Sequence, residues 1–114
     1  MEIVFRNRKL EKMCNCKRSL QEAHGEKRAR LIILRLNALR AAAHLGEFWP
    51  SQKHTGRCHE LKANRAGQLS MDLDHPYRLI FKPANNPVPK QPDGGIDWHH
   101  VTAIKIINVE DPHE

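Results

Sequence analysis

The sequence has few aromatic residues, no long apolar run and only three cysteines. Aromatic side chains make up 5% of the 114 residues, so we expect a core built mainly from Leu, Ile, Val and Ala. No stretch reaches the roughly eighteen apolar residues of a membrane span, and MEIVFRNRKL lacks the apolar segment of a secretory signal. An odd number of cysteines argues against a disulfide framework. We therefore expect one cytoplasmic domain over residues 1–114, without a membrane partner.

Positive charge is in excess, and it is unevenly distributed. The chain has 19 Lys and Arg against 13 Asp and Glu, a net charge of +6 and a pI of about 9.6. Residues 1–60 contain 13 of the cations and 6 of the acids, whereas residues 61–114 contain 6 and 7. Such a basic half favours a polyanionic partner, RNA or DNA first and an acidic protein segment second. The alternative is that the basic pI serves solubility alone.

The N-terminal half predicts one strand followed by two helices. The apolar run EIVF at 2–5 indicates a strand, and residues 6–20 indicate a short helix. The clearest helix covers 24–46, with Gly46 as its C-terminal cap. Four of its apolar residues recur at helical spacing on one face: Ile32, Leu36, Leu39 and Ala43.

The C-terminal half predicts strands. Apolar residues alternate with polar ones in four segments: 58–62, 67–74, 77–82 and 100–109. The turn at His75-Pro76 makes an antiparallel hairpin of the middle two. Residues 83–98 contain four prolines and two glycines and indicate a long loop without regular structure. The order predicts an α+β fold: an N-terminal strand and two helices packed on a mainly antiparallel sheet of about four strands.

A metal site and a cysteine nucleophile are both disfavoured. Cys14, Cys16, Cys58 and His59 together could supply four zinc ligands, but a C-x-C pair is not a usual zinc spacing. Cys58 and His59 are neighbours on a predicted strand, so their side chains point to opposite faces. The same alternation separates Cys58 from His59 as a base. We expect buried free cysteines and no metal or cofactor.

A phosphate site fits the charged residues better. Three cations flank a turn and the hairpin: Lys62, Arg65 and Arg78. Arginine can hold two phosphate oxygens at once. Imidazoles in general titrate near neutral pH, which makes His59 and His113 candidates for proton transfer. On the basic helix, Arg28 and Arg35 are seven apart and share a face that could touch a phosphate or an acidic partner. The alternative is that each of these residues is an ordinary surface charge.

The segment RCHELKANRAGQLSMDLDHPYRLIF resembles the central block of HigB toxins, which belong to the RelE-like group of bacterial toxin–antitoxin systems. Nine residues match that block in order: His59, Leu61, Lys62, Arg65, Gly67, Ser70, Arg78, Ile80 and Phe81. The E-D-Y-H pattern at the C-terminal end of these toxins corresponds to residues 110–113. The similarity covers nearly the whole chain outside the loop at 83–98.

The resemblance implies a RelE-like α+β fold and an mRNA endonuclease that acts in the ribosomal A site. It implies metal-free chemistry, in which the 2′-hydroxyl of the substrate attacks the neighbouring phosphorus and expels the 5′-oxygen. The residues implied for catalysis are His59, Arg65, Arg78, Asp111 and His113. Lys62, with Arg28 and Arg35, would bind substrate. The implied partners are the ribosome, mRNA and a HigA-type helix-turn-helix antitoxin, with operator DNA bound only through the antitoxin complex.

Three positions depart from the HigB pattern. The tyrosine of E-D-Y-H is Pro112, which offers neither a stacking surface nor a hydroxyl. The usual glycine after the lysine is Ala63, which is tolerated unless that position requires a positive φ. The usual tryptophan is Leu69, which we interpret as an exchange in the core. Pro112 keeps a second hypothesis open, a weak or inactive homologue that binds RNA or antitoxin. A third is a generic nucleic-acid-binding domain.

Overall fold

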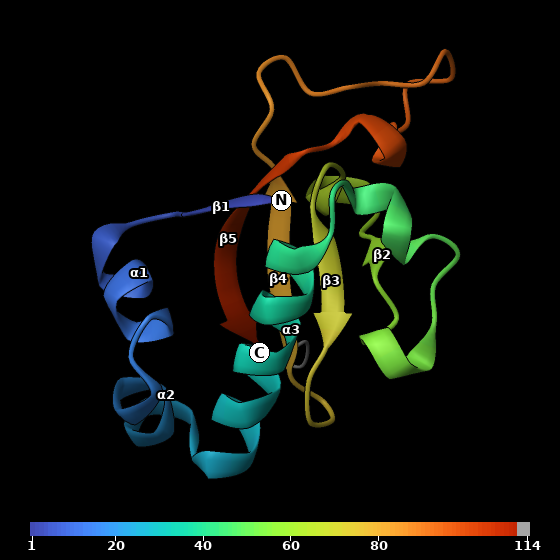
Figure 1. The fold of residues 1–114 in the computed structure, drawn as a ribbon. Helices are drawn as coiled ribbons and strands as arrows, with labels where there is room; N and C mark the ends of the chain where they lie inside the picture. The colour runs from blue at the N-terminus through green and yellow to red at the C-terminus, as the bar shows by residue number, and fades with distance from the viewer. Residues whose placement is uncertain (112–114) are drawn as a thin grey trace.

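The computed structural model describes residues 1–111 as three α-helices and one five-stranded sheet (Figure 1). The helices are α1 (Arg8–Cys14), α2 (Lys17–His24) and α3 (Glu26–Ala41). The strands are β1 (Glu2–Phe5), β2 (His59–Glu60), β3 (Leu69–Asp72), β4 (Arg78–Pro83) and β5 (Ala103–Glu110). The α+β class is as the sequence predicts, but the described residues contain one more helix and one more strand than expected.

The sheet is mixed, with strand order β1-β5-β4-β3-β2. β1 runs parallel to β5, with Ile3 opposite Ile104, and the remaining three pairs are antiparallel. The hairpin predicted at His75-Pro76 joins β3 to β4, as its short turn requires. The segment predicted as a strand at 58–62 forms only a two-residue edge strand.

The helix predicted over 6–20 is two helices, because the backbone is extended between them. Asn7 caps the first one through its Oδ1, which accepts from Leu10 N at 2.8 Å. Cys16 has φ −130° and ψ 107°, which interrupts the helical hydrogen bonds. Gly25, with φ +81°, then separates α2 from α3, a conformation that glycine adopts at little cost.

The long helix ends earlier than the sequence predicts. It stops at Ala41, so Gly46 is not its cap and Ala43 is exposed. Gly46 instead lies against His99, where an added Cβ would sit 2.3 Å from the ring Nδ1. Glycine is therefore required at position 46 because two loops approach each other closely there, and not because a helix ends there.

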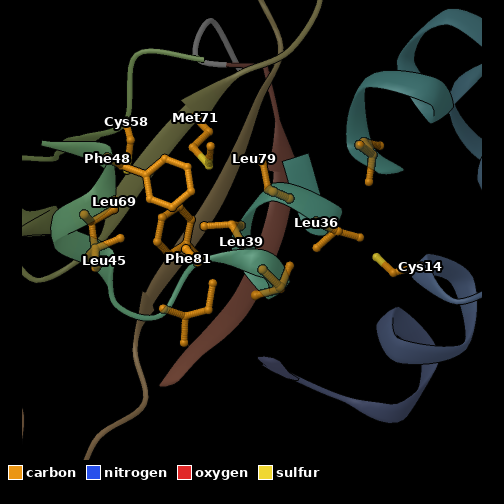
Figure 2. Packing of buried hydrophobic residues seen from close by; sticks show 14 of the residues in the cluster. Cys14, Leu36, Leu39, Leu45, Phe48, Cys58, Leu69, Met71, Leu79 and Phe81 are labelled. Atoms are coloured by element: carbon orange, nitrogen blue, oxygen red, sulfur yellow. The ribbon is translucent and has the colours of Figure 1, made fainter. Parts of the chain in front are cut away.

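The core lies between α3 and one face of the sheet (Figure 2). Leu36 and Leu39 of α3 pack toward Leu79 and Phe81 of β4, and all four are at most 1% exposed. Cys14 joins the same core from α1, which is consistent with a cysteine that acts as a small apolar side chain. The helices therefore cover one face of the sheet and leave the other for polar residues.

The loop after β4 has no helix or strand through residue 97, as its prolines predict. It is nevertheless held in place at two points. Asn85 Oδ1 accepts from Thr102 N and Ala103 N at 3.0 and 3.2 Å. Lys90 forms an isolated bridge with Ile96, which is buried. A short 3₁₀ turn, Trp98–His100, then leads into β5.

Candidate active site

Strand alternation gives the sheet an apolar face toward α3 and a polar face away from it. We call the second the outer face. On β3, Leu69 and Met71 enter the core, while Ser70 and Asp72 point to the outer face. Register then places Arg78 of β4 beside Asp72. Two rows of outer-face side chains result: Asp72, Arg78 and Glu110, and next to them His59, Ser70, Ile80 and Asn108.

Arg65 forms an ion pair that crosses the outer face. It lies between β2 and β3, and its Nη1 and Nη2 donate to the Glu110 carboxylate on β5 at 2.6 and 2.9 Å. Gln68 Oε1 accepts from the same guanidinium at 2.8 and 3.1 Å. The path from Gln68 to Glu110 passes over Ser70 and Ile80, both of which are fully buried. The hydrogen bonds from Arg65 hold the pKa of Glu110 below its usual value.

A cleft of about 180 Å³ opens beside this ion pair. Its lining comes from the segment before β2, from β3 and from the β3–β4 hairpin: Arg57, His59, Asp72, Leu73, His75, Pro76, Tyr77 and Arg78. Two arginines, two histidines and a tyrosine line the same small volume as one carboxylate, that of Asp72. An anionic group would therefore find cations and proton carriers within one site.

The orientation of His59 fixes which ring nitrogen is available. Its Nδ1 lies 2.6 Å from the carbonyl oxygen of Arg57. A carbonyl oxygen can only accept, so Nδ1 carries the proton and donates it. In the neutral ring Nε2 is then the unprotonated nitrogen, which is the arrangement that a general base needs.

The two arginines of the cleft differ in their partners. Arg57 Nε donates to Asp72 Oδ2 at 2.5 Å, and this contact raises the pKa of the guanidinium. Arg78 Nε is buried and has no hydrogen-bond partner among residues 1–111. A buried donor without a partner is costly, and such groups in native proteins are uncommon. Arg78 is therefore the cation of the cleft with a donor still to be satisfied.

Arg28 and Arg35 hold the hairpin and do not line the cleft. Arg28 donates to both oxygens of Asp74 at 2.9 and 3.1 Å, and its Cζ lies 3.4 Å from the centroid of the Tyr77 ring. Burial acts to raise the pKa of Asp74, but the hydrogen bonds and charge of Arg28 outweigh it and leave the pKa lowered. Arg35 Nε donates to the Asp72 carbonyl at 3.0 Å. Both arginines thus tie α3 to the turn that shapes the cleft.

The remaining predicted site residues are Lys62, Asp111 and His113. Lys62 is exposed and outside the lining of the cleft. Asp111 follows β5 as the last described residue, and His113, like Pro112, lies outside the described residues. The structure thus brings together His59 and Arg78, with Arg65 beside them in its ion pair.

Sequence reasoning missed Arg57, His75 and Tyr77 as lining residues. Arg57 stands two residues before His59, but its φ of +49° is not that of an extended segment, so strand alternation could not have placed it in the cleft. His75 and Tyr77 belong to the hairpin turn, where the sequence alone predicts a connection and not a site. Asp72 was visible as an outer-face residue, but its pairing with Arg57 requires the fold.

Two cysteines are unsuited to metal binding or catalysis. Burial raises the pKa of Cys14 to about 11 and that of Cys58 to about 12, so both stay thiols at neutral pH. Cys58 enters the core while His59 faces the cleft, as strand alternation predicts. Within residues 1–111, no three side chains of the usual metal-binding types gather at one point.

No protein-family model matches the chain, and the search of curated proteins found no match either. Among the helices of residues 1–111, none combines the length and the apolar character that crossing a membrane requires. Functional inference therefore rests on the cleft and on the sequence resemblance.

Proposed function

We propose that the protein is the HigB-like toxin of a type II toxin–antitoxin pair, a cytoplasmic endonuclease that cleaves mRNA on the ribosome. The observation that carries the proposal is the cleft, whose lining brings together Arg78 and His59. A phosphate group in the cleft would accept hydrogen bonds from the Arg78 guanidinium. The basic N-terminal half supports binding to a ribosome, whose RNA is a polyanion.

In this mechanism the 2′-hydroxyl of the mRNA attacks the adjacent phosphorus. His59 Nε2 takes the hydroxyl proton as the 2′-oxygen–phosphorus bond forms, and Arg78 offsets the negative charge of the phosphorane. The phosphorus–5′-oxygen bond then breaks, and an acid returns a proton to the leaving oxygen. We assign that second proton transfer to His113, the other histidine that the resemblance implies for catalysis, with Asp111 orienting an imidazole. The products are a 2′,3′-cyclic phosphate and a 5′-hydroxyl end.

The conformation of Ala63 supports the resemblance independently of the cleft. Its φ is +57°, in the left-handed region that costs a residue with a side chain about 1–2 kcal/mol. HigB toxins have glycine at this place, which is the residue that such a turn favours. Ala63 thus adopts the left-handed backbone conformation that a glycine would adopt more easily at this position.

Tyr77 adds an aromatic ring to the lining of the cleft. The ring lines the cleft and is the only tyrosine of the chain. Arg28 packs on it at 3.4 Å, which fixes its orientation. We assign to Tyr77 the stacking on an mRNA base that Pro112 is unable to provide.

The second candidate function is a non-catalytic module that binds RNA or a HigA-type antitoxin. It is favoured by Arg65, whose guanidinium is already committed to Glu110 and Gln68. In this case Arg65 stabilises the fold and does not contact a phosphate. Antitoxin binding and repression of operator DNA through the complex would remain.

The test is mRNA cleavage in a purified translation system, mapped by primer extension with and without ribosomes. The proposal predicts cuts within codons that need ribosomes and disappear on addition of a HigA-type antitoxin. Arg78→Ala should remove the cuts while antitoxin binding persists. Arg18→Ala, which changes an arginine whose side chain is 88% exposed, serves as the matched control. Absence of cuts with tight antitoxin binding would favour the non-catalytic module, and cleavage of naked RNA would contradict ribosome dependence.

A further inference from the structure

A second cavity lies on the side of β2 opposite to the cleft. It has a volume of about 240 Å³, and three segments far apart in the sequence contribute its lining. Glu60, the neighbour of His59 on β2, points into it because adjacent strand residues face opposite sides. The two sites therefore share one short strand but no side chain.

Two tryptophans form a corner in this cavity. The rings of Trp49 and Trp98 have centroids 5.3 Å apart and an angle of 69° between their planes. Trp98 is 5% exposed, but Trp49 is 61% exposed, an unusual position for so large an apolar side chain. An exposed indole beside a fixed one leaves a ring face available to a ligand.

Carboxylates complete the corner, and they are held in position. Glu60 Oε2 accepts from Trp98 Nε1 at 3.0 Å. Asp93 Oδ1 accepts from Gly95 N at 2.8 Å, in a turn also closed by Gln91 N donating to Gly95 O at 2.7 Å. The lining contains no lysine or arginine, although the chain has 19 of them. The cavity is thus an acidic region on a protein whose net charge is positive.

We propose that this cavity binds an arginine side chain presented by a protein partner. A guanidinium stacks on an indole face and donates to carboxylates with the same planar group, and Trp49, Glu60 and Asp93 offer both. The phosphates of a nucleic acid would meet two negative charges here, whereas the outer-face cleft offers them cations. This proposal stands whether or not the cleft cleaves RNA.

The experiment uses the two indole N–H signals in a nitrogen-15 correlation spectrum of the labelled protein. Titration with N-acetyl-arginine amide should shift both indole signals saturably. N-acetyl-citrulline amide, which has nearly the same shape and no charge, should leave them in place. Equal shifts with both compounds, no saturable shift with either, or tighter binding of guanosine monophosphate would each overturn the proposal.

Two variants locate the site. Glu60→Gln keeps an oxygen that can accept from Trp98 Nε1 and removes the charge, so arginine binding should weaken about fivefold. Glu2→Gln removes the same charge from an exposed position on β1 and should change nothing. Trp49→Leu, at an exposed position, should abolish the shift of the Trp98 signal. Unchanged affinity in Glu60→Gln would contradict the proposal.

Discussion

The two faces of the sheet use the same strands for different purposes. Toward α3, Leu79 and Phe81 are fully buried among apolar side chains. Their contacts are hydrophobic and require no particular orientation of the groups. On the outer face, Arg78 and Asp72 stand opposite each other on β4 and β3, and the contacts are hydrogen bonds and ion pairs. One face holds the fold together, and the other arranges charge. The comparison teaches that substitutions of Leu79 or Phe81 should affect stability, whereas substitution of Arg78 should affect activity.

The largest expected effect comes from the core face. Phe81→Ala should lower the free energy of unfolding by about 3–5 kcal/mol, because it removes a fully buried aromatic ring and leaves a cavity. Urea unfolding followed by circular dichroism measures the change. Lys82→Ala, at the exposed neighbouring position, should change stability by less than about 0.5 kcal/mol. Similar losses in the two variants would refute the assignment of the faces.

A smaller effect comes from the ion pair across the outer face. Glu110→Gln should lower stability at pH 7 by about 1 kcal/mol, since both side chains are partly solvated. The folded-state pKa of Glu110 is lowered from 4.5, so its contribution is present above that pH and is lost as pH falls through the folded-state value. Unfolding measured from pH 7 to pH 3 should show the two proteins converging in acid. A constant difference over that range would mean that the charge of Glu110 is not what stabilises the fold.

The smallest effect tests the turn that leads from β2 to β3. Ala63→Gly should raise the free energy of unfolding by up to about 1 kcal/mol, because φ is +57° there. Ala66→Gly is the matched control in the same turn, at φ −53°, and should be neutral or destabilising. Thermal unfolding of the three proteins side by side measures the difference. A loss of stability in Ala63→Gly would show that the position gains nothing from glycine.

The fold class could be predicted from the sequence because its elements follow local rules. The spacing of Ile32, Leu36 and Leu39 identified the long helix, and all three are buried. Alternation on β3 separated the core side from the outer side. The division of residues 6–20 into two helices was not predicted, since the extended conformation at Cys16 has no strong signal in the residue types.

The site was only partly predictable for a physical reason. His59 and Arg78 were found because residues on different strands of one small sheet can converge on one face. The sequence could not tell which arginines are already paired, and the fold commits Arg28 to Asp74 and Arg65 to Glu110. Pairing depends on contacts between residues more than forty positions apart. Among the arginines of residues 1–111, Arg78 alone has a buried side-chain donor that lacks a partner.

The most direct test of the account is the single-turnover rate of ribosome-dependent mRNA cleavage by His59→Gln. Glutamine keeps a donor for the Arg57 carbonyl but is unable to take a proton, so the rate should fall about 10²–10⁴-fold. Stability should stay within about 1 kcal/mol of the unmodified protein. His54→Gln, an exposed histidine outside the cleft, should cleave at the unmodified rate. Undiminished cleavage by His59→Gln would contradict the assignment of the outer-face cleft as the active site.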